Sequence, residues 1–198
     1  MSKLFTQAQW LEHLRRGKSI YQFGELQRLT KLSEVATQRA VHRLARARLI
    51  AKLGKGYYAN LLQPPRIEDV SAVLYPPSYI SLESALFHHG IIEQTPQTLT
   101  CVSTNKTKTF QSAFGEIYYA HLQAGLFFGY ELNGRSFMAL PEKAALDFIY
   151  LQLQNGHTPT LDEWHWEEIT MARLLEFSAK FPRTVQRHLR AALSAASE

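Results

Sequence analysis

The chain has a single cysteine and no long apolar run, and both features exclude classes of protein to which it could belong. Its single cysteine, Cys101, excludes an internal disulfide and lies in an alternating, strand-like segment, which favours a small packed residue over a nucleophile. No run approaches the roughly 18 consecutive apolar residues of a membrane span, and the N-terminus is too polar for a secretory signal. The composition therefore predicts a cytoplasmic protein without a membrane partner.

Motifs of the common enzyme classes are also missing. The chain has no glycine-rich phosphate loop, no serine elbow and no paired-cysteine motif. His88 and His89 lack acidic or cysteine partners at metal-binding spacing and are interpreted as helix-end residues. His165 has Glu167 and Glu168 nearby, but the flanking tryptophans favour a packed aromatic segment over a metal site. We expect no catalytic residue, no metal and no cofactor.

One acidic segment leaves an enzymatic alternative open. Asp147, together with Glu142 and Lys143, superficially suggests a metal-dependent nuclease. Glu142 follows Pro141 at the start of an expected helix, where the helix dipole favours an acid, and the expected strand with an acid-x-Lys signature is absent. A nuclease is therefore the weakest of three hypotheses, after a DNA-binding regulator and a protein-interaction module.

What the chain does contain is an uneven distribution of charge. Residues 1–62 hold 12 Lys or Arg against 3 acidic residues, a net charge of +9, whereas the remainder carries −4 and the whole chain +5. A domain that neutralises nucleic-acid phosphates and releases their counterions needs such clustering. The first third of the chain is therefore the candidate DNA-binding region.

The residues between Phe23 and Asn60 have the layout of a winged helix-turn-helix. A first helix and a turn at 30–32 lead to Ser33, a good N-cap for a second helix over 34–48. Residues 49–53 and 57–59 are predicted strands of a wing, joined by a tight turn with positive φ at Gly54, Lys55 and Gly56. The expected apolar stripe of the second helix is Ala36, Ala40, Val41, Leu44 and Ala45.

Polar residues off that stripe and on the wing are the candidate contacts with double-stranded DNA. We expect the first two turns of the second helix to read base edges, because Arg and Gln can bond two base atoms at once. The later arginines and the wing lysines are expected to contact phosphates, with the wing also able to reach the adjacent groove. The predicted set is Gln38, Arg39, His42, Arg43, Arg46, Arg48, Lys52 and Lys55.

Three segments follow from these patterns, with an α+β fold class overall. Residues 1–62 form the winged helix-turn-helix domain, and 63–77 form a linker in which two Pro-Pro pairs exclude helix. Residues 78–198 form a mixed α/β domain with a helical C-terminal tail. The tail is expected to contain helices over 161–169, 171–180 and 183–196.

The predicted second domain begins with a helix that Ser81 caps and that ends at Gly90. Four strands are expected over 99–104, 115–121, 126–132 and 136–140. Asn133-Gly134 is a strong hairpin signal, and Pro141 is expected to start a helix with an apolar face. The many aromatics here are either packed residues or anchors for a protein partner: Phe110, Phe114, Tyr118, Tyr119, Phe127, Phe128 and Tyr130.

Several stretches together resemble the AbiEi family of antitoxins from type IV toxin–antitoxin and phage-exclusion systems. They are the winged-helix region, YISLESALFHHGII, LTCVSTNKTKTF and GLFFGYELNGRSFMALPEKAALDFIYL, and they cover most of residues 5–153. The segments 81–86 and 140–147 carry the resemblance best, because they follow an N-terminal winged helix in that order. Winged helices often have Gly where this chain has Arg48, and the tail after Gln154 matches least well.

The resemblance implies a transcriptional repressor that binds operator repeats upstream of its own operon through the N-terminal domain. It also implies that the C-terminal domain counteracts a cognate toxin resembling a nucleotidyltransferase. Repeated operators imply that two copies of the chain bind one DNA molecule, as a dimer on DNA. The alternative is a solitary winged-helix regulator with a protein-interaction domain.

Overall fold

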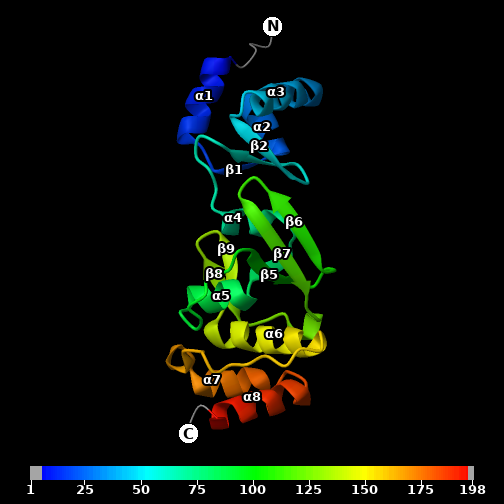
Figure 1. Ribbon diagram of the computed structural model, residues 1–198. Helices are drawn as coiled ribbons and strands as arrows, with labels where there is room; N and C mark the ends of the chain where they lie inside the picture. Colours follow the sequence, from blue (N-terminus) through cyan, green and yellow to red (C-terminus); the bar gives the residue numbers. More distant parts are fainter. Residues whose placement is uncertain (1–5, 196–198) are drawn as a thin grey trace. The chain divides into compact units, whose positions relative to one another are not determined.

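The computed structural model describes residues 6–195 and divides into two compact units with separate sheets (Figure 1). Unit 1 comprises the residues up to Leu74 and Ser112–Phe114, and unit 2 comprises Tyr75–Gln111 and the residues from Gly115 onward. Helices and strands are mixed in both, so the α+β class is confirmed. Within the described residues, no helix is long and apolar enough to cross a membrane.

The described residues of unit 1 form four helices and a three-stranded antiparallel sheet of order β1-β3-β2. The predicted helix pair and hairpin are confirmed, whereas the sequence patterns missed the helix Gln7–Arg16 and the strand Ile20–Gln22. The elements are α1 (Gln7–Arg16), β1 (Ile20–Gln22), α2 (Phe23–Thr30), α3 (Glu34–Arg46), β2 (Ile50–Gly54), β3 (Tyr57–Asn60) and α4 (Ile67–Leu74).

The core of unit 1 lies where α1, α2, α3 and the sheet meet. Thr6 starts α1 with a capping box to Gln9, and α1 then buries Trp10 and Leu14. Helical spacing supplies the other buried side chains from α2 and α3. The full core cluster is Trp10, Leu14, Tyr21, Leu26, Ala40, Val41, Leu44 and Ile50.

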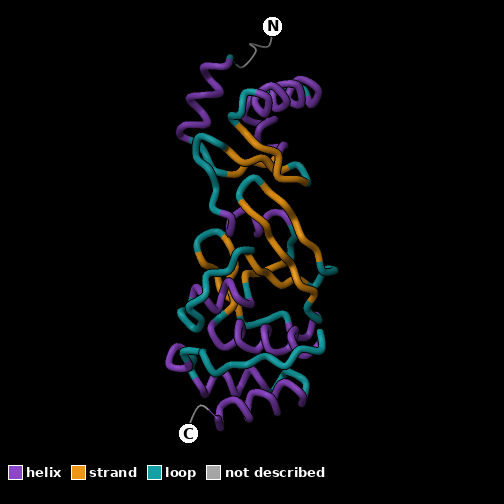
Figure 2. The backbone as a smooth tube through the Cα atoms, viewed as in Figure 1, coloured by secondary structure: helices purple, strands orange, loops and turns teal. Residues whose placement is uncertain are grey.

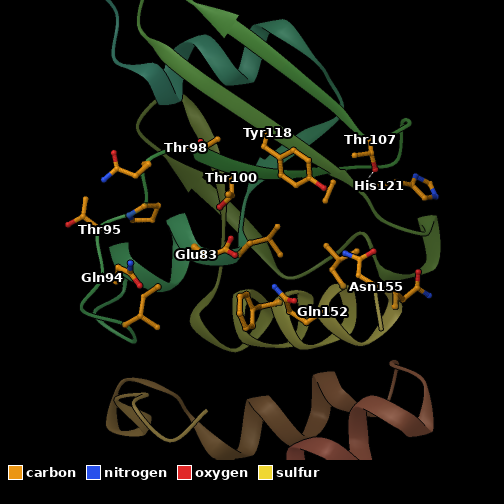
Figure 3. Close-up of a pocket in the computed structure, with 18 residues that line it drawn as sticks. Glu83, Gln94, Thr95, Thr98, Thr100, Thr107, Tyr118, His121, Gln152 and Asn155 are labelled. Carbon is orange, nitrogen blue, oxygen red and sulfur yellow. Dashed lines mark hydrogen bonds between the residues drawn. The ribbon is translucent and has the colours of Figure 1, made fainter. Parts of the chain in front are cut away.

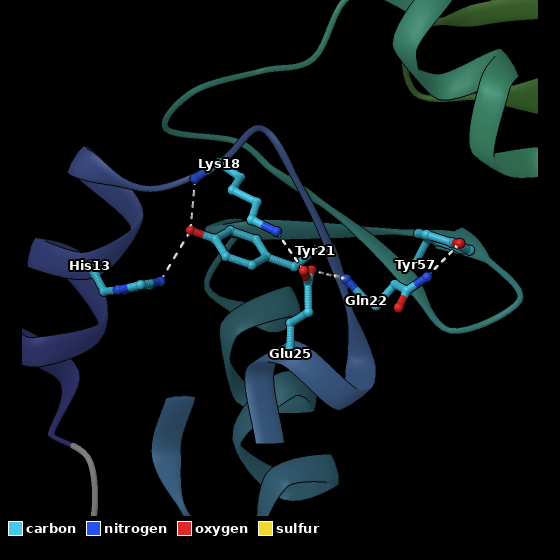
Figure 4. Close-up of polar contacts among 6 residues, drawn as sticks. All are labelled: His13, Lys18, Tyr21, Gln22, Glu25 and Tyr57. Atoms are coloured by element: carbon cyan, nitrogen blue, oxygen red, sulfur yellow. Dashed lines mark hydrogen bonds and ion pairs between the residues drawn. The ribbon is translucent and has the colours of Figure 1, made fainter. Parts of the chain in front are cut away.

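Polar contacts join α1 to the sheet and to α2 (Figure 4). The Tyr21 hydroxyl lies 3.1 Å from His13 Nε2 and accepts the backbone N–H of Lys18 at 3.0 Å. Lys18 in turn forms an ion pair with Glu25 at the start of α2. Buried Asn60 donates to the carbonyl oxygens of Leu14 (2.7 Å) and Lys18 (2.9 Å), so the end of α1 is fixed to β3.

The predicted Pro-rich linker is wrong in one respect, because it contains a helix. Helix α4 spans Ile67–Leu74 and buries Val70, Ser71 and Leu74. A proline disfavours helix at its own position and at the residue before it, and residues 66–74 are free of both restrictions, which leaves room for this helix.

Unit 2 is built on a six-stranded mixed sheet of order β6-β7-β5-β4-β9-β8 (Figure 2). Strands β5 and β7 are parallel, and so are β4 and β9, while β4–β5 and β8–β9 are antiparallel. The strands are β4 (Ser78–Ile80), β5 (Leu99–Ser103), β6 (Lys108–Ser112), β7 (Gly115–His121), β8 (Tyr130–Asn133) and β9 (Ser136–Ala139). The helices are α5 (Leu82–His88), α6 (Pro141–Gln154), α7 (Met171–Ser178) and α8 (Arg183–Ala195), with short 3₁₀ turns at Ala124–Leu126 and Trp166–Glu168.

Most of the local features predicted for this unit, such as its hairpin turn and the start of α6, are confirmed. Gly134 has φ 65° in the β8–β9 hairpin, where Asn133 pairs with Ser136. Pro141 is the first residue of α6, and its expected apolar face is buried. Cys101 is buried in β5. Ser81 is the exception, because its hydroxyl forms no cap and donates to Asp147 instead (2.9 Å).

Two predicted elements of unit 2 are wrong. Residues 161–169 contain only a 3₁₀ turn, because the backbone N–H of His165 bonds Ile91 O (3.0 Å) rather than a carbonyl one helical turn back. The strand expected over 126–132 begins only at Tyr130, after Gly129 with φ 71°. Short-range periodicity does not distinguish an aromatic loop that packs on the core from a helix or strand.

The aromatic side chains of unit 2 pack chiefly on one another. Tyr119 is fully buried and lies against Tyr75 and Phe110, with ring centroids 5.2 and 5.7 Å away. Tyr79 contacts Phe127 and stacks on Tyr130 at 4.5 Å. Packing thus accounts for these rings, although Phe137 on β9 remains 45% exposed beside Leu132 of β8.

Candidate nucleic-acid interface

Helix α3 is positioned in unit 1 by a turn and a cap that the sequence predicts. Lys31 ends α2 in the left-handed conformation (φ 55°), and its N–H donates to Gln27 O at 2.9 Å. Ser33 then caps α3, with its hydroxyl accepting the N–H of Ala36 at 3.4 Å. The orientation of α3 relative to α2 is therefore set by local hydrogen bonds as well as by the core.

The buried face of α3 differs slightly from the predicted stripe. Thr37, Ala40, Val41 and Leu44 are buried, whereas Ala36 is half-buried and Ala45 is exposed. Thr37 fits the same three- and four-residue spacing, and its hydroxyl donates to Ser33 O (3.0 Å), which allows a polar residue to be buried there.

The opposite face of α3 carries the predicted contact residues in two adjacent rows. Arg39, Arg43 and Arg46 form one row at i, i+4 and i+7, and Gln38 and His42 form the other. All five are exposed. Within residues 6–195, none of the three arginines is in an ion pair, whereas Arg16 and Lys18 elsewhere in unit 1 pair with Glu12 and Glu25. The α3 face therefore presents positive charge that the described part of the protein does not neutralise.

The β2–β3 hairpin adds two further cations. Lys52 on β2 pairs across the sheet with Tyr58, and Lys55 stands at the tip, and both side chains are exposed. Gly54, Lys55 and Gly56 have φ of 124°, 46° and 79°, as the tight turn requires. The register of the ladder shifts between Lys52 and Gly54, as at a β-bulge.

Arg48 lies beyond the end of α3, so the predicted helix over 34–48 is two residues too long. The helix ends at Arg46, and Arg48 has φ 52°. The N–H of Leu49 donates to Leu44 O (3.0 Å) and that of Arg48 to Ala45 O (3.1 Å), which together form a Schellman motif. Leu49 packs on the core beside Leu44, so this motif directs the chain into β2.

Three exposed basic residues of unit 1 occupy positions of positive φ. Lys31, Arg48 and Lys55 have φ of 55°, 52° and 46°, a conformation that costs a residue with a Cβ atom about 1–2 kcal/mol relative to glycine. Lys31 was not among the predicted contact residues. It lies directly after α2, at a helix end that favours Gly or Asn, and a lysine at such a position is the sequence signal that singles it out.

Replacing Arg48 with Gly should raise the free energy of unfolding of unit 1 by about 1 kcal/mol, because Gly adopts positive φ without strain. Thermal or denaturant unfolding followed by circular dichroism measures this effect. Arg39→Gly is the matched control, since Gly inside a helix is expected to destabilise by about 1 kcal/mol. If Arg48→Gly destabilises the protein, the left-handed backbone at this position is not a source of strain.

The acidic cluster that suggested a nuclease is a buried network in unit 2. Asp147 and Lys143 are each 0% exposed and form an ion pair within α6. The Asp147 carboxylate also accepts from the Tyr79 and Ser81 hydroxyls, both at 2.9 Å, and Lys143 Nζ donates to Tyr79 at 2.8 Å. Burial raises the pKa of Asp147 and lowers the pKa of Lys143, because both charged forms are removed from water.

The third member of that cluster, Glu142, has a different set of contacts. Its carboxylate accepts the backbone N–H of Thr170, the residue before α7, at 2.9 Å, and lies 3.5 Å from Arg173. It therefore joins α6 to α7 and does not face Asp147's network. With Asp147 saturated and fully buried, the three residues do not gather into a site that a substrate reaches.

The histidines that were considered as metal ligands also bond to separate partners. His88 ends α5 and lies 3.2 Å from Asn133 Nδ2, while His89 Nε2 donates to Ala139 O at 2.8 Å. Among the described residues, no three His, Cys, Asp or Glu side chains are grouped as metal ligands.

No protein-family model and no curated protein matches the chain.

Proposed function

We propose that unit 1 is a winged helix-turn-helix that binds duplex DNA, and that the chain is a transcriptional repressor and antitoxin of the AbiEi type. The observation that carries the DNA-binding proposal is the row of exposed arginines on α3, which form no ion pair with any residue that the structure describes. The element order α1–β1–α2–α3–β2–β3 with an antiparallel sheet also supports it, because a winged helix has this arrangement.

In this proposal α3 enters the major groove. Gln38, Arg39 and His42 meet base edges, where the planar amide and guanidinium groups can each bond two atoms. Arg43 and Arg46, one or two turns further along, contact phosphates. Arg48 and the lysines of the β2–β3 hairpin extend the phosphate contacts along the backbone.

The basic residues at positive φ support a role for their charge. Glycine would relieve strain at Lys31, Arg48 and Lys55, and none of the three side chains is needed to fill the core, since all are exposed. Strained backbone of this kind is concentrated at functional sites. A polyanionic ligand accounts for three cations at three such turns.

We further propose that unit 2 acts by binding rather than by catalysis and counteracts a nucleotidyltransferase-like toxin, as the AbiEi resemblance implies. The full burial of Asp147 and Lys143 supports a structural role for the pair. The proposed site of repression is a set of operator repeats, with one copy of the chain on each repeat.

Two cell-based readouts test this proposal. A reporter fused to the chain's own promoter should be repressed by the wild type and released by the combined substitution of Arg39, Arg43 and Arg46 with Gln. Coexpression with the toxin encoded beside the gene should restore growth, and the same triple variant should still rescue if antitoxin activity lies in unit 2. Repression without rescue would leave a solitary regulator, and rescue lost with the triple variant would place antitoxin activity in unit 1.

A further inference from the structure

Unit 2 contains two adjoining cavities, which have Glu83, Ile92, Gln94 and Phe148 in common in their walls. Their volumes are about 680 and 960 Å³, each within the range of pockets that hold organic ligands, roughly 300–1,000 Å³. Because the two share four wall residues, we treat them as one groove, the Glu83 groove. No part of the proposed function uses it.

Neutral hydrogen-bonding groups line the first cavity. Figure 3 shows Glu83 of α5 between Thr100 of β5 and Gln152 of α6, with Tyr118 of β7 on the sheet side of the same space. Most of the remaining polar groups are amides and hydroxyls, such as Gln94. These groups can orient a polar ligand, and Glu83 is the one carboxylate that the described part of the chain places in this cavity.

The second cavity gives the groove a strongly negative character. It adds the carboxylates of Glu93, Asp162 and Glu163, and among the described residues no Lys or Arg lines either cavity. His165 lies between two acids, with Nε2 3.4 Å from Glu93 and Nδ1 3.3 Å from a Glu167 oxygen. Glu83 itself is half-buried and forms no ion pair within the described residues. An anionic ligand would be repelled here, whereas a cation would neutralise the groove.

Aromatic rings make this groove suitable for a planar cation. Tyr118 and Phe148 are half-buried and line the first cavity. Phe148 also lines the second, where its ring centroid lies 5.7 Å from that of Trp164. A guanidinium can stack on such rings and form a bidentate pair with a carboxylate, which an ammonium group cannot do.

We propose that the Glu83 groove binds a polypeptide segment that presents arginine side chains, with one guanidinium paired to Glu83 between Tyr118 and Phe148. A polypeptide suits the groove better than a small amine, because acids and rings continue from one cavity into the next. Backbone groups of the segment can use the amides and hydroxyls of the first cavity. The inference concerns unit 2 alone and does not depend on DNA binding by unit 1.

Fluorescence anisotropy of the full chain with a short fluorescein-labelled peptide of alternating Gly and Arg tests the proposal. Glu83→Gln should weaken binding about tenfold, because it removes a charge-assisted, partly desolvated pair. The matched control is Glu131→Gln, an exposed carboxylate on β8 outside both cavities, for which we expect less than about a twofold change. Thermal unfolding of both variants verifies that they are folded.

A second series identifies the occupant. The Arg peptide should bind more tightly than its Lys counterpart, a Glu counterpart should not bind, and Phe148→Leu should reduce the preference for Arg over Lys. Equal weakening by Glu83→Gln and Glu131→Gln would show non-specific attraction and overturn the proposal. Displacement of the peptide by equimolar spermidine would also overturn it, in favour of a small-amine site.

Discussion

Replacing Lys143 with Met should lower the free energy of unfolding by about 3–5 kcal/mol, because it leaves the fully buried carboxylate of Asp147 without its cation. Met has a similar length, so lost packing contributes little. Lys143 Nζ also lies 5.1 and 5.2 Å from the ring centroids of Phe128 and Phe181, and these contacts are lost as well. Urea denaturation measures the change.

The pH dependence of this loss distinguishes charge from packing. Burial already raises the pKa of Asp147 above its ordinary value of 3.8, and removal of Lys143 should raise it further. A group with a raised pKa in the folded state contributes stability below its unfolded pKa and loses it as pH rises through the folded pKa. The destabilisation by Lys143→Met should therefore be smallest near pH 4 and should increase as pH rises. A loss that does not change with pH would contradict the buried-charge explanation.

The double variant Lys143→Met with Asp147→Asn is the control for that experiment. Asn removes the unpaired charge, and its amide oxygen can still accept from the Tyr79 and Ser81 hydroxyls. We expect the double variant to be more stable than Lys143→Met alone at neutral pH. If it is less stable, the two residues contribute independently and not as a pair.

Replacing Arg39 with Ala should weaken binding to the operator by about 1–3 kcal/mol and relax the preference for one base position. Arg39 is exposed, lies early on α3 and has no carboxylate partner within the described residues, so its guanidinium is available to a base. Competition between the operator and single-position variants of it measures both effects.

Replacing Lys55 with Ala is the matched comparison, because this exposed lysine at the hairpin tip is proposed to contact phosphate. It should weaken all duplexes alike and reduce the salt dependence by about one counterion. If Arg39→Ala, like Lys55→Ala, weakens binding to operator and to scrambled DNA by the same factor, α3 is not the element that reads sequence.

Local signals predicted several turns and helix starts well in both units. Ser33 as an N-cap, the glycines around Lys55 and Pro141 at the start of α6 each act through hydrogen bonds or φ preferences within a few residues. For the same reason, the hairpin at Asn133 is confirmed. These features depend on the chain's own neighbours and are visible without the rest of the fold.

Elements that depend on distant partners were missed. Strand β1 has three residues and exists because it pairs with β3, and β4 has three residues paired with β5 and β9. Residues 161–169 have helical spacing of apolar residues but bond through His165 to Ile91, far away in the sequence. Periodicity cannot predict a hydrogen bond between two separate segments.

The candidate interface was predictable as a set, because charge and helical spacing together separate exposed from buried faces. The conformation of Arg48 was not predictable from its residue type, since Gly or Asn is the usual occupant of that position. The burial that counts against the nuclease alternative was also visible only in the structure, because sequence spacing does not reveal that Asp147 is buried.

The most direct test of the central claim is fluorescence anisotropy of the full chain with labelled DNA from upstream of its own operon and with a scrambled duplex, over a series of salt concentrations. The proposal predicts tighter binding to the upstream DNA, a steep decrease of affinity with salt, and loss of both when Arg39, Arg43 and Arg46 are replaced with Gln. Binding that is absent, or that is insensitive both to salt and to the triple substitution, would contradict it.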